Sequence, residues 1–242
     1  MIMEDILREI KKHEDKEKAK VLLRFFKTGK GEYGEGDVFL GIIVPEQRAI
    51  AREFKDISFS EAQKLLDSKI HEHRMIALMI LIEKYKKADE AGKEKIFKLY
   101  LKNTKNINNW DLVDLSCPQI VGDFLLSRDR SILYSLAKSK NLWERRIAII
   151  STFAFIRNDQ FGDTFKIAEI LLEDEHDLLH KAVGWMLREI GKRDEKKEKE
   201  FIAKHCTDMP RTMLRYSIER FPEKDRKRYL DLPSRKKKRL KI

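Results

Sequence analysis

Apolar residues recur at helical spacing along almost the whole chain, and the pattern predicts one helix after another. Residues 4–28 are predicted as an amphipathic helical stretch. Its apolar positions are Ile6, Leu7, Ile10, Val21, Leu22, Phe25 and Phe26. Further along, Ser60-Glu61-Ala62-Gln63 has the spacing of a capping box and predicts the start of another helix.

A glycine-rich loop interrupts this pattern at residues 28–42. Gly29, Gly31 and Gly34 have the spacing of a dinucleotide-binding motif, but they follow a helix rather than a strand and open no long helix. We therefore interpret the segment as a mobile or hairpin-like binding loop. Phe39 to Val44 could form a short extended piece, and Pro45 is expected at the first position of the next helix.

The stretches at residues 73–79, 145–150 and 180–186 share a pattern, a basic residue followed by an apolar helix, and the Trp110 helix lies in register between the first two, so that the period is about 35 residues. The equivalent positions are Arg74, Trp110, Arg146, Lys181 and Arg215. A period of this length without strands is typical of an α-solenoid, and HEAT-like packing fits best. We predict an all-α, right-handed stack of about six helix pairs, in a single domain over residues 1–232 with a basic tail at 233–242.

Composition agrees with a folded helical protein. Charged residues make up 38% of the chain and hydrophobic residues 42%, which argues against disorder. No apolar run approaches the roughly 20 residues that a membrane span needs, and the N-terminus lacks the layout of a signal peptide. Cys117 and Cys206 form no CxxC pair, so a reducing cytoplasm is the expected location.

The chain carries a net charge of +11. Part of it comes from the tail, which has no acid among Arg235, Lys236, Lys237, Lys238, Arg239 and Lys241. A basic body with a basic tail favours a polyanionic partner, most commonly nucleic acid. The alternative is a protein that is basic for solubility alone.

The most informative stretch is Asn108 to Leu115. Asn108 or Asn109 is a good N-cap, and Asp111 suits the positive first turn of a helix. Trp110 and Asp114 are four residues apart, so both should project from one face, whereas Leu112, Val113 and Leu115 can be buried. The plain interpretation is a core tryptophan with a capping aspartate. Stacked repeats would instead place Trp110, Asp114, Arg146 and Trp185 in one concave groove.

Other candidate sites are weak. His176 and His180 have a zinc-compatible spacing, but no third ligand is evident. His71 and His73 should face different sides of a helix. Residues 192–200 mix both charges and are expected to form a solvated linker. Ser116 has no histidine partner that would suggest an activated nucleophile.

Several stretches together resemble the AlkD family of HEAT-repeat DNA glycosylases over about residues 5–232. They are Gly31 to Ile42, Asn109-Trp110-Asp111-Leu112-Val113-Asp114, Leu142-Trp143-Glu144-Arg145-Arg146-Ile147-Ala148, Lys181 to Glu189, and Met209 to Tyr216. The resemblance implies excision of positively charged N3- and N7-alkylated purines from double-stranded DNA, without a deep base-flipping pocket. It also implies that neither a cofactor nor a metal is needed, and we expect a monomer with no membrane contact.

By this resemblance Asp114 matches the catalytic aspartate, and Trp110 and Trp185 match the aromatic pair that cradles the lesion nucleotide. Arg146 matches a phosphate-binding arginine, and Arg188 a further backbone contact. Lys181 and Phe25 are the other expected DNA contacts. There are departures: Phe25 stands where a tyrosine can occur, and Asp177, Leu178 and Leu179 stand where an aromatic can occur.

Two other functions remain open at this point. One is a HEAT-repeat protein that binds damaged or distorted DNA without excising bases. The other is a protein-binding scaffold whose positive charge is incidental. An exposed Trp110 in a groove lined by basic residues would disfavour the scaffold, and only an excision assay separates the glycosylase from the non-catalytic binder.

The tail is expected to add affinity without selecting the lesion, because its charges are unpatterned and can only neutralise phosphates. Deleting residues 234–242 should flatten the salt dependence of DNA binding and leave the preference for damaged DNA unchanged. Titrations of damaged and undamaged duplexes over a series of salt concentrations would measure both. A loss of the preference for damage would contradict this role.

Overall fold

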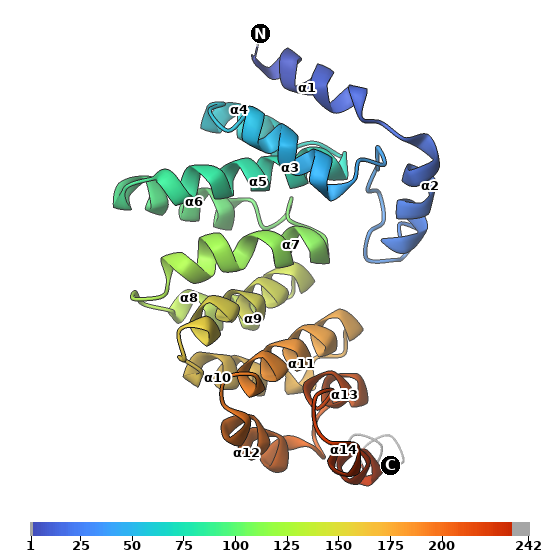
Figure 1. Ribbon diagram of the computed structural model, residues 1–242, viewed down its shortest axis with the longest axis vertical. Helices are drawn as coiled ribbons and strands as arrows, with labels where there is room; N and C mark the ends of the chain where they lie inside the picture. The colour runs from blue at the N-terminus through green and yellow to red at the C-terminus, as the bar shows by residue number, and fades with distance from the viewer. Residues whose placement is uncertain (1, 234–242) are drawn as a thin grey trace. The chain divides into compact units, whose positions relative to one another are not determined.

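The computed structural model describes residues 2–233, and these fold as fourteen α-helices with no strand among them (Figure 1). The predicted tail lies almost wholly outside this range, because residues 234–242 are not described. The chain divides into two compact units at the peptide bond between Ser116 and Cys117. The prediction of one continuous domain over residues 1–232, and that of a right-handed stack, stay predictions.

The first unit contains the helices that build the candidate site. They are α1 (Ile2–Lys12), α2 (Lys16–Phe25), α3 (Val44–Glu53), α4 (Phe59–Leu66), α5 (His71–Lys87), α6 (Glu90–Lys102) and α7 (Trp110–Cys117), the last of which ends one residue past the boundary. Helix α5 forms the centre of the unit: α3 and α4 pack against it, and α6 contacts it as well. Its residues from Met75 to Ile82 are all buried.

The N-terminal stretch over 4–28, predicted as amphipathic and helical, consists of two helices, α1 and α2. The carboxylate of Asp15 caps α2 by accepting hydrogen bonds from the N–H groups of Glu17 and Lys18, both at 3.0 Å. An aspartate at this position satisfies the free N–H groups of a new helix, so the chain turns between α1 and α2. This break contributes to a total of fourteen helices where about six pairs were predicted.

The glycine-rich segment, interpreted from the sequence as a mobile or hairpin-like loop, is a series of turns, and no hairpin forms in it. The N–H groups of Gly29 and Gly31 donate to the side chains of Glu32 and Glu35, and the segment forms no strand. Its extended end makes an isolated parallel bridge between Val38 and Ile70.

Two helix starts also differ slightly from the predictions. Helix α3 begins at Val44, one residue before Pro45. The capping box of α4 is formed by Ser58 and Glu61, two residues earlier than predicted, because Ser58 rather than Ser60 takes the N-cap position. Boundary shifts of this size are common at helix ends.

The second unit continues as helices. They are the π-helical turn η1 (Pro118–Gly122), α8 (Ser131–Ala137), α9 (Leu142–Arg157), α10 (Gly162–Ile170), the 3₁₀ turn η2 (Leu171–Glu173), α11 (Asp177–Gly191), α12 (Glu195–His205), α13 (Arg211–Ser217) and α14 (Glu223–Asp231). Helix α9 packs against α8, α10 and α11, and α11 packs against α13. The linker predicted over 192–200 is instead largely the start of α12, since Asp194 caps that helix.

The predicted repeat register is confirmed helix by helix. The five equivalent residues lie in five separate helices, with one further α-helix between each successive pair. Arg74 is in α5, Trp110 in α7, Arg146 in α9, Lys181 in α11 and Arg215 in α13. The 35-residue spacing therefore reflects one helix pair per repeat.

Gly184 shows how closely two of these helices approach. A Cβ atom at this position would lie 2.5 Å from Tyr216 Cβ and 2.6 Å from the carbonyl oxygen of Met213, both from α13. A glycine inside a helix costs about 1 kcal/mol relative to alanine. The close packing of α11 on α13 explains why alanine would nevertheless be worse here.

We expect Gly184→Ala to lower the free energy of unfolding by about 1–3 kcal/mol through overpacking. Gly162→Ala is the matched control, because a Cβ there would meet no heavy atom within 4 Å. Denaturant unfolding of both variants measures the difference. An equally small effect of the two substitutions would contradict the close approach.

Candidate active site

A pocket of about 680 Å³ lies in the first unit between α2, α3, α5 and α7. Trp110 and Asp114 both line it, so the prediction that they share one face of α7 is confirmed. Phe25 lines it from α2 and is 61% exposed. Most other lining residues are apolar: Val21, Leu22, Phe26, Phe39, Ile42, Ile43, Val44, Met75 and Leu115.

The side chains of α7 are buried or line the pocket as the helical spacing predicts, with one exception. Leu112 and Val113 are fully buried, as predicted. Leu115 is only half-buried and lines the pocket beside Asp114, so its predicted burial was only partly right. Asn109 starts the helix, and its side-chain oxygen accepts from the N–H of Trp110 at 2.8 Å.

Aromatic rings hold Trp110 in place. The ring of Phe26 stacks on the indole with centroids 5.4 Å apart, and Phe25 contacts it edge-on at 6.0 Å. Phe26 also stacks on Phe39, whose other contact is the imidazole of His71 at 4.5 Å. Such pairs stabilise by about 0.5–1.5 kcal/mol each beyond the burial of area. The indole is therefore presented to the pocket by a packed cluster of rings.

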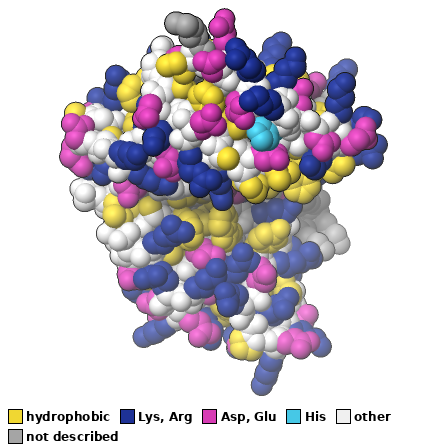
Figure 2. All heavy atoms as spheres, turned by 45° about the horizontal axis from the view of Figure 1, so that its top comes forward, with side chains coloured by type: hydrophobic (Ala, Val, Ile, Leu, Met, Phe, Trp, Pro, Cys, Tyr) yellow, Lys and Arg dark blue, Asp and Glu magenta, His cyan; other side chains and the backbone are white. Residues whose placement is uncertain are grey.

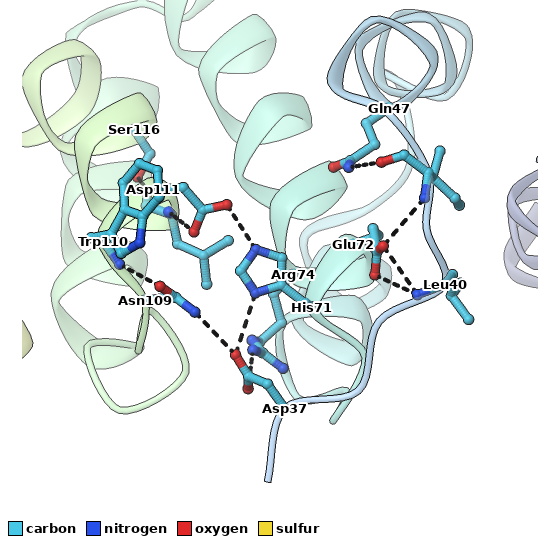
Figure 3. A network of polar contacts seen from close by, with 12 residues as sticks. Asp37, Leu40, Gln47, His71, Glu72, Arg74, Asn109, Trp110, Asp111 and Ser116 are labelled. Carbon is cyan, nitrogen blue, oxygen red and sulfur yellow. Dashed lines mark hydrogen bonds and ion pairs between the residues drawn. The ribbon is translucent and has the colours of Figure 1, made fainter. Parts of the chain in front are cut away.

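His71 also belongs to a network of charged side chains that links the loop, α5 and α7 (Figure 3). His71, at the start of α5, binds Asp37 through Nδ1 at 3.3 Å and Asp111 through Nε2 at 2.9 Å. Arg74, one turn further along α5, donates to Asp37 at 2.6 Å. Asn109 reaches the same carboxylate at 3.4 Å. The network therefore links the end of the glycine-rich loop, α5 and the first turn of α7.

These contacts shift the protonation of the buried groups. Burial alone would lower the pKa of His71, but the charge of Asp111 and the hydrogen bonds to Asp111 and Asp37 raise it to about 9. Burial disfavours the ionised form of Asp37, yet the hydrogen bond from His71 and the charge of Arg74 hold its pKa below the usual range. At neutral pH His71 is thus an imidazolium between two carboxylates.

Glu72 fixes the other side of the loop. Its fully buried carboxylate accepts hydrogen bonds from the N–H groups of Leu40, Gly41 and Ile42 at 2.8–3.3 Å. Gly41 is required there because its φ is +84° and an added Cβ would lie 2.1 Å from the carbonyl oxygen of Asp15. The first turn of α5 therefore anchors the whole segment from Asp37 to Ile42.

The other predicted site residues belong to the second unit. Trp185 on α11 is half-buried, contacts Phe153 at 5.7 Å and donates from its indole N–H to Glu189 at 2.9 Å. Lys181 pairs with Asp177 at 2.7 Å, and Arg188 pairs with Glu219. That these side chains share one groove with Trp110 and Asp114 stays a prediction.

Arg146 differs in its environment from the other predicted DNA contacts. Its side chain is buried, with 5% of the residue exposed, and Nη1 donates to the carbonyl oxygen of Leu178 at 2.5 Å. This contact ties α9 to the first turn of α11. The role of Arg146 as a phosphate contact stays a prediction.

Other sequence candidates have structural partners. His176 caps α11, and His180 Nε2 lies 2.6 Å from the carbonyl oxygen of Asp174. No group of three potential metal ligands occurs within residues 2–233. Nor does any helix in that range combine the length and apolarity that crossing a membrane requires. On the face shown in Figure 2, Lys and Arg side chains are scattered among acidic and hydrophobic ones.

His71, Asp37 and Phe26 are the parts of the site that the sequence did not identify. His71 was considered only for metal binding, and its expected separation from His73 is correct: His73 bonds Ser68 on another side of α5. Asp111 was assigned to the helix dipole alone. The one available signal was the placement of His71 and Arg74 three residues apart, which puts two donors on one helix face.

Comparison with known proteins places this arrangement in a class of all-α solenoids. A solved structure, named as a predicted DNA alkylation repair enzyme from Enterococcus faecalis, superposes with a TM-score of 0.68. The two chains are 16% identical, and the match covers 87% of this chain and 98% of that one. The similarity confirms the predicted fold class, an all-α solenoid of HEAT-like helix pairs.

The chain belongs to the DNA alkylation repair enzyme family, whose model matches residues 6–221. No curated protein matches it by sequence. Family membership gives the protein a role in the repair of alkylated DNA, with DNA as its partner, and it disfavours an unrelated protein-binding scaffold.

Removing one charge from the buried network should destabilise the first unit strongly. We expect Asp37→Ala to lower the free energy of unfolding by about 3–5 kcal/mol, because it leaves the buried Arg74 and His71 without their shared carboxylate. Asp56→Ala, at an exposed aspartate of the same unit, should change it very little. Urea unfolding at neutral pH compares them, and equal small losses would contradict the importance of the network.

Proposed function

We propose that the protein is a DNA glycosylase that excises cationic N3- and N7-alkylated purines by hydrolysing the N-glycosidic bond. The observation that carries the proposal is the position of Trp110 and Asp114, which line one pocket from one face of α7. An aromatic face and a carboxylate side by side suit a substrate that carries positive charge on a planar ring.

Hydrolysis of the N-glycosidic bond of a cationic purine needs few catalytic side chains. An alkylated purine is already cationic, so the bonding electrons can leave with the base without protonation by a general acid. The sugar then develops positive charge, which a carboxylate stabilises while it orients the attacking water. Water supplies the new oxygen at the sugar carbon and loses one proton. In this scheme Asp114 is the stabilising carboxylate, and no cofactor takes part.

Trp110 would grip the cationic nucleotide. A tryptophan face attracts a cation by about 0.5–2 kcal/mol, and the stack with Phe26 holds the indole in one orientation. Trp185 is proposed as its counterpart, and Lys181 and Arg188 as contacts to the DNA backbone. Both basic residues lie in partly exposed ion pairs, which are weak and can be exchanged for phosphate contacts.

The composition of the pocket lining indicates whether the protein recognises the edge of the damaged base. The resemblance to the AlkD family implies that the reaction takes place at the sugar, with the base outside a deep pocket. Apart from Lys18 and Gln47, the residues that α2 and α3 place on the pocket are apolar, so these helices offer few polar groups that could read the edge of a purine. This composition supports recognition of the cationic charge and the sugar rather than recognition of the base edge.

The central test is Asp114→Asn. We expect release of 7-methylguanine or 3-methyladenine from alkylated DNA to fall by about 10²-fold or more, the scale of losing one well-placed electrostatic group. Affinity for DNA should change little, because phosphate contacts position the DNA and are kept. Trp110→Ala should reduce both excision and affinity. Asp56→Asn, at an exposed aspartate of the same unit, serves as the control.

Two outcomes would overturn the proposal in different ways. Undiminished excision by Asp114→Asn would remove this residue from catalysis, because asparagine caps a helix as well as aspartate does. Tight DNA binding by the wild-type protein without any base release would favour a non-catalytic binder of damaged or distorted DNA.

A further inference from the structure

His71 lies between carboxylates that come from two distant parts of the chain. Asp37 belongs to the glycine-rich loop and Asp111 to the first turn of α7, and one imidazole ring contacts both. His71 is 2% exposed, and its ring packs against Phe39 and Phe26. The residue also lines the pocket together with Asp111 and Asp114.

We propose that the His71 imidazolium is a positioning residue, which holds the first turn of α7, and with it Trp110 and Asp114, at the pocket through Asp111. The inference rests on the proposed glycosylase function for its catalytic consequence, whereas its structural part can be measured without catalysis. It also gives the glycine-rich loop a role, because Asp37 anchors the opposite side of the same ring.

The geometry requires the protonated ring. An imidazolium donates from both nitrogens, whereas a neutral imidazole donates from one and presents a lone pair at the other. With Asp37 and Asp111 both ionised, loss of the proton would set that lone pair against one carboxylate. If the lone pair were at Nε2, it would face the carboxylate oxygen of Asp111, which lies only 2.9 Å from that nitrogen. Either neutral tautomer therefore loses one of the two contacts; Asp37 keeps Arg74 as a partner, whereas the contact to Asp111 is the one that His71 alone makes with the first turn of α7.

The balance of charge leads to the same conclusion. From the loop Asp37 faces the ring, from α7 Asp111 faces it, and from α5 Arg74 contributes a positive charge. Glu72, also on α5, is satisfied by backbone N–H groups of the loop. With His71 charged, two positive and two negative side chains balance. This agrees with the raised pKa of His71, about 9, given above.

The contact between His71 and Asp111 lies at the first turn of α7, the helix that carries Trp110 and Asp114. Asp111 lies between Trp110 and Asp114 in sequence, and α7 has only eight residues. A short helix is held by its neighbours rather than by its own hydrogen bonds. Release of Asp111 would therefore let the first turn of α7 move, and the stack of Phe26 on Trp110 would move with it.

The decisive measurement is the pH dependence of excision. In the wild type, kcat should fall above about pH 9 as His71 loses its proton, after subtraction of spontaneous base loss. His71→Gln should lower kcat at pH 7 about tenfold with KM changed less than twofold, and the alkaline fall should disappear. His73→Gln is the matched control: it lies on the same turn, bonds Ser68 and has a pKa lowered to about 4 by burial and by Arg74.

Asp111→Asn provides a second variant that does not depend on the stability of His71→Gln. Asparagine can donate to Nε2 of the neutral ring while Nδ1–H still donates to Asp37, so either protonation state keeps both contacts. Whatever its rate at pH 7, this variant should therefore lose the alkaline fall in kcat. An alkaline fall that persists unchanged in Asp111→Asn would overturn the proposal.

The NMR contact between the rings of Phe26 and Trp110 separates this inference from the proposed function. If the wild type releases no base, yet raising the pH from 7 to 10 weakens this contact in the wild type and not in Asp111→Asn, the positioning role stands and the glycosylase function fails. If the wild type releases bases while His71→Gln keeps both its kcat and the ring contact, the positioning role fails and the glycosylase function stands.

Discussion

Four charged side chains enclosed together set the main constraint on the first unit. Asp37, His71 and Arg74 are almost fully buried, and Asp111 is only partly exposed. A charge removed from water is costly unless its partners satisfy it, so none of the four can move independently. The glycine-rich loop must pass α5 where Asp37 meets His71 and Arg74, and the first turn of α7 must lie where Asp111 meets His71. The shape of the pocket follows from these two requirements.

The sequence predicted what depends on local periodicity. Helical spacing identified the class of fold, and the recurrence from Arg74 to Arg215 identified one helix pair per repeat. Trp110 and Asp114 were found because four residues make one turn, a purely local relation. The same reasoning failed at Asp15, where a single capping side chain divides an otherwise continuous amphipathic pattern into α1 and α2.

The network around His71 was beyond such reasoning. Asp37 and His71 are 34 residues apart, and Asp111 follows His71 by 40. No periodic pattern connects these positions, since their meeting depends on how α5 packs against the loop and α7. Asp111 had an adequate local explanation in the helix dipole, and nothing in the sequence required a second one. Phe26 was assigned to an apolar face without any indication that it would stack on Trp110.

The two groups of charges in this protein suit different tasks. A buried ion pair is weak evidence for stability, because apolar residues of similar size often do as well, but its directional contacts can specify a single arrangement. The charges around His71 fit that role. They connect the loop, α5 and α7 through directional contacts, which apolar packing does not provide.

Lys181 and Arg188 lie in partly exposed ion pairs, Lys181 with Asp177 of the same helix and Arg188 with Glu219. Exposed pairs cost little to break, so the proposed exchange of each carboxylate for a DNA phosphate would require little free energy. Under the proposed function, the buried charges around His71 hold the helix that carries Asp114, whereas ion pairs such as those of Lys181 and Arg188 can break and re-form as DNA binds and leaves.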